Sequence, residues 1–334
     1  MPVTIKDVAR ESGVNVSTVS RALNGEYGVH AETREHVVAV AERLRYRPNR
    51  VARGLVTGQS HTLGLVVSDI RNPFFAEVAR GAEDAAYRAG YDLVLCNSDL
   101  DADKQLRYLQ ALVEKRVDGI LMNSVASLNR RQQDQLAAMG VPIVLLNRGA
   151  ARHAFSTISA DNEAGGALAA AYLMRLGHRR IAHLTGPRHH GNMTARARGF
   201  VRALEAAKQP VHPVVMFGRN TFAGGMELAR KLVAQHPEVS AIFVASDTMA
   251  FGVMRALLEA GRQIPRDVSV IGFDNVELAS IVHPPLTTIH QPKYEIGQAA
   301  VEILLRLAGR GEHRVPEHRL FGVNLVERQS CGAI

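Results

Sequence analysis

Five side chains in this sequence have the chemistry needed to hold a small hydroxylated molecule. Phe74 and Phe75 are adjacent aromatic rings on which the C–H face of a sugar can stack, and Arg196 is a planar donor of several hydrogen bonds. Asp247 and Asp274 are carboxylates, so each hydroxyl of such a ligand can donate to an aspartate and accept from the arginine. The same residues also fit structural roles, because one phenylalanine can belong to a helix core and Arg196 can form a structural ion pair with Asp274.

The elements that must position these residues are alternating strands and helices, which begin near His61. Leu63–Val67 is a short, continuously apolar run, as expected for a parallel strand that is buried on both faces. A helix is predicted from about Phe74 to Ala89. Further strands are predicted at 93–95, 119–122, 143–146, 180–184, 241–244 and 268–271, with helices between them. Repeated strand–helix units predict an α/β fold with Rossmann-like parallel sheets, and two successive sets predict two similar lobes.

Ligands bind to such sheets outside the carboxyl ends of the strands, so the residues found there form a predicted pocket. The chain is expected to cross between lobes near residues 160 and 288, and the helix at 293–308 is expected to return to the first lobe. Seven residues follow predicted strand ends: Asn72, Phe74, Phe75, Asn147, Arg148, Asp247 and Asp274. Three more complete the predicted pocket, namely Arg196 early in a helix, Gln291 in a crossover and Phe222 as a further aromatic wall.

The first sixty residues have a different chemistry, because arginines gather toward their end. The cluster consists of Arg43, Arg45, Arg47, Arg50 and Arg53. The whole chain has a net charge of +8 and a pI near 9.8, which suits a protein that binds a polyanion. Residues 1–60 carry nine Lys and Arg against six Asp and Glu, a net +3, so most of the excess lies elsewhere. Charge alone therefore does not identify DNA as the partner.

Three predicted helices precede the arginine cluster. Thr4 and Asp7 form a capping-box pattern at the start of the first helix, and Gly13 ends it. Asn15 is a suitable N-cap for a second helix over 16–23. A third amphipathic helix carries apolar residues on one side: Val37, Val38, Ala41 and Leu44. A helix, a short turn containing glycine and a second helix form the helix-turn-helix pattern, whose second helix enters a DNA major groove.

Runs along almost the whole chain resemble the lactose-repressor (LacI/GalR) family, with ribose-operon-type repressors the nearest in character. Four runs resemble its DNA-binding head and hinge: Thr4-Ile5-Lys6-Asp7-Val8-Ala9, Val16-Ser17-Thr18-Val19-Ser20-Arg21, Tyr46-Arg47-Pro48-Asn49 and Val51-Ala52-Arg53-Gly54-Leu55. Five more continue the resemblance: Asn72-Pro73-Phe74-Phe75, Lys115-Arg116-Val117-Asp118-Gly119, Gly177-His178-Arg179-Arg180-Ile181, Ile271-Gly272-Phe273-Asp274-Asn275 and Pro284-Pro285-Leu286-Thr287-Thr288-Ile289.

The resemblance implies three parts: a helix-turn-helix DNA-binding domain at 1–46, a hinge helix and linker at 47–60, and an effector-binding and dimerisation domain at 61–334. The last part is expected to resemble periplasmic binding proteins, with lobe 1 at about 61–160 and 293–325 and lobe 2 at about 161–289. The pocket residues named above are then expected in or beside the effector cleft, and His190 is added because such repressors vary at that position with their ligand.

The implied DNA-binding residues are Thr4, Val16, Ser17, Thr18, Ser20, Arg21, Asn24, Tyr46, Asn49, Arg50, Ala52, Arg53 and Leu55. Val16, Ser17 and Arg21 are expected to face base edges. Leu55 is expected to enter the minor groove from a hinge, residues 50–56, that folds only on DNA because it is too short to be a stable helix alone.

The function implied by the resemblance is sequence-specific, effector-controlled transcription regulation, expected to be repression of a catabolic operon. The partners are a palindromic operator, a small sugar effector with ribose favoured, and a second copy of the chain in a homodimer or larger assembly. A purine or nucleoside is the alternative effector, since aromatic stacking suits either. No cofactor is expected. No metal is expected either, because the adjacent His189 and His190 do not make a metal site by themselves. The two cysteines fit no metal-ligand spacing, and we expect Cys96 to be a small buried hydrophobic residue and Cys331 to be a thiol in the C-terminal tail.

Two other classes of protein fit the sequence less well. The sequence does not favour an enzyme on a Rossmann-like fold, because three motifs of such enzymes are missing: G-x-G-x-x-G after a predicted strand, G-x-x-x-x-G-K-[ST] and G-x-S-x-G. A solute-binding protein would have a similar body, but the DNA-binding head and the lack of an export signal before Thr4 oppose it. No apolar stretch approaches the length that spans a bilayer, so the expected location is the cytoplasm.

Overall fold

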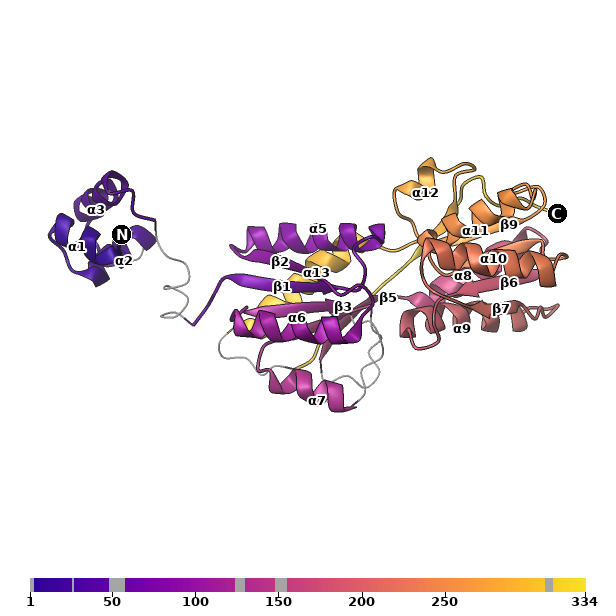
Figure 1. Cartoon of the computed structure of the whole chain (residues 1–334), viewed down its shortest axis with the longest axis horizontal. Coiled ribbons are helices and arrows are strands. Elements are labelled where there is room, and N and C mark those ends of the chain that lie inside the picture. Colours follow the sequence, from indigo (N-terminus) through magenta and orange to yellow (C-terminus); the bar gives the residue numbers. More distant parts are fainter. Residues whose placement is uncertain (1–2, 26, 48–57, 124–129, 148–154, 310–314) are drawn as a thin grey trace. The chain divides into compact units, whose positions relative to one another are not determined.

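The structure is a computed structural model that describes residues 3–25, 27–47, 58–123, 130–147, 155–309 and 315–334. The chain divides into a unit of residues 1–60 and a unit of residues 61–334 (Figure 1). Six predicted site residues lie outside the described ranges: Asn49, Arg50, Ala52, Arg53 and Leu55 of the hinge, and Arg148 of the pocket.

The N-terminal unit is a domain of three short helices around a small core. They are α1 (Ile5–Ser12), α2 (Val16–Asn24) and α3 (Ala31–Arg43). Each helix contributes one fully buried valine, namely Val8, Val19 and Val37. Burying such a side chain contributes about 1.5–3 kcal/mol, so these contacts hold the turn between α1 and α2 in place.

The predicted helix ends of this domain are present. The Asp7 carboxylate accepts from the backbone N–H of Thr4 at 3.0 Å and from its hydroxyl at 2.7 Å, and Gly13 ends α1 with a φ of +70°. Asn15 caps α2 by accepting from the backbone N–H of Thr18 at 2.8 Å. The prediction for α3 was wrong at one position. Val38 is exposed and Val40 is buried instead, because the core-facing positions of α3 follow Val37 by three and four residues.

The body contains two six-stranded sheets, one in each lobe. The lobe 1 sheet has the order β11-β5-β4-β3-β1-β2, and all its neighbouring strands are parallel. Its strands are β1 (Thr62–Val67), β2 (Asp92–Asn97), β3 (Gly119–Asn123), β4 (Ile143–Leu146), β5 (Ser156–Ala160) and β11 (His318–Phe321). The lobe 2 sheet has the order β12-β10-β9-β8-β6-β7 and is parallel except between β10 and β12. Its strands are β6 (Ile181–Thr185), β7 (Val214–Phe217), β8 (Ala241–Val244), β9 (Ser269–Asp274), β10 (Thr287–His290) and β12 (Asn324–Val326).

Helices cover both faces of each sheet (Figure 1). In lobe 1, α5 (Pro73–Arg88) and α13 (Lys293–Ala308) cover one face, and α6 (Ala102–Glu114) and α7 (Arg130–Ala138) cover the other. In lobe 2, α8 (Asn162–Arg175) and α9 (Gly191–Glu205) lie on one face, with α10 (Phe222–Gln235) and α11 (Asp247–Glu259) on the other. The short α12 (Leu278–Ile281) follows β9. None of the helices in the described ranges combines the length and apolar composition that crossing a bilayer requires.

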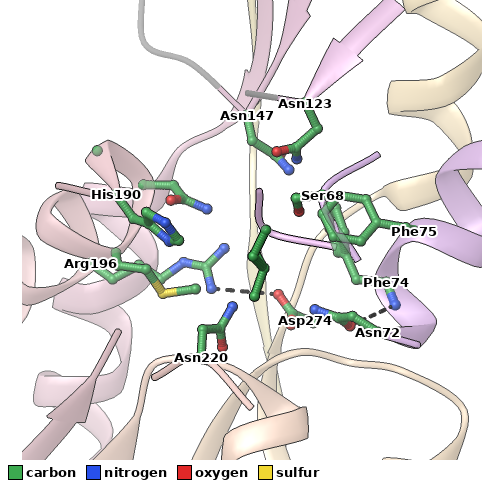
Figure 2. A pocket seen from close by; sticks show the side chains of 14 residues that line it. Ser68, Asn72, Phe74, Phe75, Asn123, Asn147, His190, Arg196, Asn220 and Asp274 are labelled. Carbon is green, nitrogen blue, oxygen red and sulfur yellow. Dashed lines mark hydrogen bonds and ion pairs between the residues drawn. The ribbon is translucent and has the colours of Figure 1, made fainter. Parts of the chain in front are cut away.

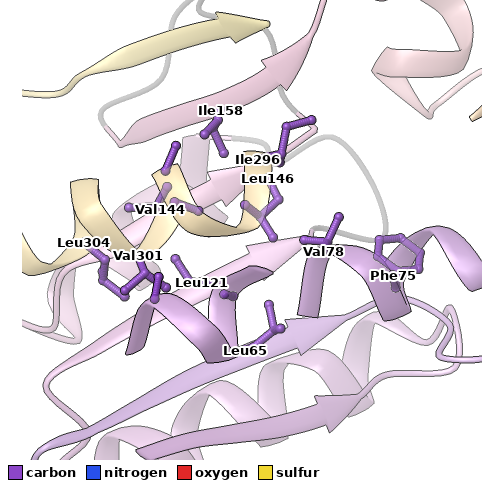
Figure 3. Close-up of a cluster of buried hydrophobic side chains, with 14 of the residues drawn as sticks. Leu65, Phe75, Val78, Leu121, Val144, Leu146, Ile158, Ile296, Val301 and Leu304 are labelled. Atoms are coloured by element: carbon purple, nitrogen blue, oxygen red, sulfur yellow. The ribbon is translucent and has the colours of Figure 1, made fainter. Parts of the chain in front are cut away.

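The return of α13 to lobe 1 was predicted and is confirmed. This helix follows the lobe 2 strand β10, yet its Val301 and Leu304 pack with Val78 of α5 and with the lobe 1 strands (Figure 3). The two helices touch at backbone distance, because a Cβ added at Gly81 in α5 would lie 2.0 Å from the carbonyl oxygen of Tyr294 in α13. Such close packing fixes α13 firmly to lobe 1.

The chain passes between the two sheets three times. It passes from β5 to lobe 2, returns from β10 to lobe 1 through α13, and passes again from β11 to β12. The C-terminal residues therefore belong to lobe 2. Cys331, which was expected to be a tail thiol, takes part in this packing: its Sγ–H donates to the Val270 carbonyl at 3.2 Å, and burial raises its pKa to about 12.

Candidate functional site

A pocket in the body lies between the carboxyl ends of strands from both lobes (Figure 2). Lobe 1 lines it with Ser68, Asn72, Phe74, Phe75, Leu100, Asn123 and Asn147. Lobe 2 lines it with His190, Gly191, Asn192, Met193, Arg196, Asn220 and Asp274. The structure thus brings together seven of the predicted pocket residues: Asn72, Phe74, Phe75, Asn147, His190, Arg196 and Asp274.

The aromatic wall of the pocket is built by the first turn of α5. Pro73 occupies the start of this helix, and the Asn72 side chain caps it by accepting from the Phe74 N–H at 3.0 Å. Phe74 and Phe75 lie edge to face with ring centres 5.2 Å apart. Both rings are buried in the lobe 1 core and both line the pocket, so each belongs to the core and to the pocket wall. Asn72 also accepts from the Thr248 hydroxyl of α11 at 3.3 Å, which links the two lobes beside the pocket.

The charged wall of the pocket is centred on Arg196 in α9. Its Nε donates to Oδ1 of Asn162 at 2.8 Å, its Nη1 donates to the Ala245 carbonyl, and its guanidinium lies 3.7 Å from the centre of the Phe273 ring. Nη1 also lies 3.5 Å from Oδ1 of Asp274 (Figure 2). These contacts hold the guanidinium in one orientation, with Asp274 beside it at the pocket wall.

Burial dominates the protonation of this pair. It lowers the pKa of Arg196 to about 10, against the opposing effect of the carboxylates Asp274 and Asp247. It raises the pKa of Asp274 to about 6, although Arg196 and Lys293 both favour the ionised form. The Asp274 carboxyl therefore takes up a proton at a higher pH than an ordinary aspartate does, while Arg196 stays a guanidinium at neutral pH.

Asp247 was predicted in the pocket, and the structure places it elsewhere. It is fully buried as the first residue of α11, where its carboxylate accepts from the Val276 N–H at 2.9 Å and from the Thr288 hydroxyl at 2.6 Å. Burial and the nearby Asp274 raise its pKa to about 8. A residue that opens the helix after a strand can turn back toward the sheet, so its position in the chain alone did not show whether it reaches the pocket.

Two further residues that were expected in or beside the pocket do not line it. Gln291 is fully buried, and its Nε2 donates to Oδ1 of Asp274 at 2.6 Å, so it supports a pocket residue from behind. Phe222 is the first residue of α10, and its side chain is 44% exposed and absent from the pocket wall. The neighbouring Asn220 lines the pocket in its place.

Several pocket residues were missed by the sequence reasoning: Ser68, Leu100, Asn123, Gly191, Asn192, Met193 and Asn220. Ser68 and Asn123 stand directly after or at the end of predicted strands, so the strand-end rule could have found them. Asn220 follows β7, which was not predicted, and therefore had no such signal. Within the described ranges no group of three His, Cys, Asp or Glu side chains could hold a metal ion.

The N-terminal unit presents one face of α2 to solvent. Val16 is 40% exposed, and Ser17, Arg21 and Asn24 are exposed as well, while the opposite face packs on α1 and α3. The hydroxyls of Ser17 and Thr18 both donate to Oδ1 of Asn15, at 2.7 and 2.8 Å. Thr4 is exposed at the start of α1, whereas Ser20 is half-buried. Tyr46 is half-buried against the head core, and this burial raises its pKa.

Comparison with known proteins matches both units. Residues 4–49 match the model of bacterial regulatory proteins of the lacI family, and residues 170–331 match the periplasmic binding protein-like domain. The chain is 40% identical over 331 residues to the HTH-type transcriptional repressor PurR of Vibrio cholerae serotype O1, covering 98% of this chain and 97% of the relative.

Solved structures agree with this match. The lac repressor dimer bound to operator and the anti-inducer ONPF has a TM-score of 0.88 and 31% identity, with full coverage of both chains. A LacI family regulator from Enterococcus faecium with bound ribose has a TM-score of 0.74 and 31% identity over 82% of this chain and 99% of that one. The chain therefore belongs to the LacI family of DNA-binding transcriptional regulators.

Proposed function

We propose that this regulator is a cytoplasmic repressor that acts as a homodimer on a palindromic operator and is released by a neutral monosaccharide, with D-ribose the favoured effector. The observation that carries the proposal is the pocket between the lobes. It combines an Arg–Asp pair, two aromatic rings and five asparagine side chains: Asn72, Asn123, Asn147, Asn192 and Asn220.

The charge of the pocket favours a neutral ligand. In the described lining, the guanidinium of Arg196 faces the carboxylate of Asp274 at 3.5 Å, so the two charges largely cancel. A phosphorylated effector would bring negative charge that Arg196 is already committed to balance. A hydroxylated, uncharged molecule meets no such conflict.

The amide side chains favour a hydroxyl-rich ligand. Each asparagine offers both a donor and an acceptor, which matches hydroxyl groups that also do both. The ribose found in the Enterococcus faecium relative supports a ligand of pentose size. A purine remains the alternative, because Phe74 and Phe75 could stack on a base. Their rings are nearly perpendicular, however, at 88°, and so do not form a parallel slot for a flat bicyclic ring.

Ligand and operator are expected to share one conformational equilibrium. The pocket takes residues from both lobes, and the Asn72 side chain accepts from the backbone N–H of Phe74 and from the hydroxyl of Thr248 in the opposite lobe, so an occupied pocket favours one arrangement of the lobes. The body begins at His61, directly after the predicted hinge. Any such coupling is reciprocal and amounts to about 1–3 kcal/mol in comparable systems. We assign release, because a sugar effector fits derepression of a catabolic operon.

Calorimetric titration of the full chain tests the proposal. D-ribose, D-xylose, D-glucose and hypoxanthine would be titrated with and without saturating operator, selected from a random DNA library. D-ribose should bind, and operator should lower the affinity for D-ribose by the same factor by which D-ribose lowers the affinity for operator. Gln235→Ala, an exposed change on α10 away from the pocket, is the matched control and should bind like the wild type. Binding of hypoxanthine but no sugar would establish the alternative, and equal ribose affinities in both titrations would exclude allosteric control.

A further inference from the structure

A buried lysine behind the pocket contacts the backbone that carries Asp274. Lys293 is the first residue of α13 and is 6% exposed. Its Nζ donates to the carbonyl oxygens of Asp274 at 2.8 Å, Asn275 at 2.9 Å and Gln291 at 3.3 Å. An ammonium group has three N–H donors, so these three backbone acceptors can use all of them.

The location is an unfavourable one for a cation. The N-terminus of a helix carries a partial positive charge, and Lys293 opens a helix of 16 residues. Burial lowers the pKa of Lys293, while the carboxylates of Asp274 and Asp247 act in the opposite direction. A neutral side chain of similar length would fill this space without the cost of burying a charge. The three carbonyls are acceptors that a neutral apolar side chain could not satisfy, whereas a cationic side chain with several N–H donors can.

The turn that receives these bonds has an unusual backbone. Asp274 has a φ of +121°, a value that residues with a side chain rarely adopt, and Asn275 has a φ of +54°, in the left-handed region that asparagine tolerates better than most residues. The Asn275 side chain is held by Nη2 of Arg328, which donates to its Oδ1 at 2.7 Å, and by Nδ1 of His290 at 3.1 Å. The carbonyls of both residues are held by Lys293.

This contact also joins the lobes. The turn ends β9 in lobe 2, whereas α13 packs on α5 of lobe 1 at backbone distance. Lys293 therefore connects the backbone of a pocket residue in lobe 2 to a helix that is fixed in lobe 1.

We propose that Lys293 is a positioning residue for effector binding: its ammonium holds the Asp274–Asn275 turn so that the Asp274 carboxylate faces Arg196 and the pocket, and it ties this turn to lobe 1. This inference rests on the proposed function of the pocket. It extends that function to a residue that does not line the pocket and that the chain could replace without changing the pocket wall.

The charges around Asp274 give the proposal a specific signature. Arg196 of α9, Lys293 of α13 and Asp247 of α11 face it, and the uncharged Gln291 donates to it from the crossover. Arg328 and His290 act one residue further along, on Asn275. Lys293 lowers the pKa of Asp274, so loss of the ammonium should raise that pKa and delay ionisation of the carboxylate to higher pH.

The experiment measures D-ribose affinity of the full chain by calorimetry between pH 5 and 8. Lys293→Met and Lys293→Gln remove the charge, and Lys293→Arg keeps it. Lys208→Met, at an exposed lysine after α9, is the matched control for loss of one positive charge. Both charge-removing variants should bind D-ribose about tenfold more weakly at pH 7, with the pH at half-maximal affinity moved upward. Lys293→Arg should keep the wild-type midpoint, and Lys208→Met should change neither quantity.

Three results would overturn the assignment. In the first, the charge-removing variants bind with the wild-type affinity and midpoint. In the second, Lys293→Arg shows the same shift as Lys293→Met. In the third, both charge-removing variants fail to fold by circular dichroism while Lys293→Arg folds normally, which would make the ammonium a requirement of the fold and not of binding.

A measurement without ligand separates this inference from the proposed function. If the wild type binds no sugar, the proposed function fails, and thermal unfolding of the ligand-free chain then decides the role of Lys293. A carboxyl whose pKa is raised by folding stabilises the folded state at low pH and loses that contribution as pH rises through the folded value. The loss of Tm caused by Lys293→Met should therefore grow from pH 5 to pH 8. A pH-independent loss would show that Lys293 does not act on Asp274.

Discussion

Replacement of Asp274 by asparagine is the sharpest test of how the pocket binds its ligand, because it keeps the shape of the side chain and removes the charge. The carboxylate lies 3.5 Å from the Arg196 guanidinium and accepts from Gln291 at 2.6 Å, and asparagine can keep the second contact through its oxygen. A hydrogen bond to a charged acceptor contributes about 1.5–3 kcal/mol. Asp274→Asn should therefore lower the affinity for D-ribose by about 10–150-fold at pH 8.

The pH dependence gives this prediction its sign. Burial raises the pKa of Asp274 to about 6, so the wild type should lose affinity as pH falls through about 6, where the acceptor becomes protonated. The Asp274→Asn protein has no such group and should bind with nearly constant affinity from pH 5 to 8. Calorimetry at half-unit intervals would show the difference, and His190→Gln controls for the histidine that also lines the pocket. If Asp274→Asn kept the wild-type affinity, or the same pH slope, the carboxylate would not contact the ligand.

Three further predictions test the structure at other points. Gly81→Ala should lower the Tm by about 3–10 °C, because the added Cβ would meet the Tyr294 carbonyl and overpacking of this kind costs about 1–3 kcal/mol. Gly322→Ala is the control: no atom lies within 4 Å of its added Cβ, so the Tm should not change. Asn72→Ala should destabilise the protein by about 0.5–2 kcal/mol through loss of a helix cap, and it should also lower the affinity for D-ribose. Thr221→Ala removes the cap of α10, which does not line the pocket, and should lower stability alone. Equal D-ribose affinities in the two variants would show that Asn72 does not contact the ligand. Arg21→Ala should cost about 1–3 kcal/mol on the cognate operator and relax its base preference in a binding selection, and equal weakening on random DNA would instead identify a phosphate contact.

The sequence predicted the strands best where their residues are almost wholly apolar. Leu63–Val67 and Ile143–Leu146 are almost wholly apolar and were recognised as strands. Ser156–Ala160 and His318–Phe321 mix polar with apolar residues, and β7 is only half-buried along its length, so none of these three gave the same signal. The head was predicted closely because its caps and glycine turn depend on residues that are neighbours in sequence.

The pocket was predicted only in part, for a geometric reason. Strand ends can be located from the sequence, and those of the predicted strands gave five of the residues that line the pocket: Asn72, Phe74, Phe75, Asn147 and Asp274. Whether a side chain at a strand end points into the pocket or back into the sheet depends on the turn that follows. Asp247 points back toward Val276 and Thr288, and Gln291 reaches Asp274 from behind. Lys293 gave no signal at all, because its three acceptors are backbone atoms and two of them are about 18 residues away.

The two interpretations of Arg196 and Asp274, as an ion pair and as a binding site, are not alternatives. Charge-assisted bonds between a guanidinium and a carboxylate are usually about 2.7–2.9 Å long, and the distance here is 3.5 Å, so the pair is close but incompletely bonded. Arg196 is anchored by Asn162 and the Ala245 carbonyl, and Asp274 is anchored by Gln291 and, through its backbone, by Lys293. Neither side chain is therefore free to close the gap. A ligand hydroxyl placed between them can accept from the guanidinium and donate to the carboxylate, completing both sets of bonds at once. The anchors that prevent an ideal ion pair are thus the same ones that leave hydrogen-bonding capacity for a ligand.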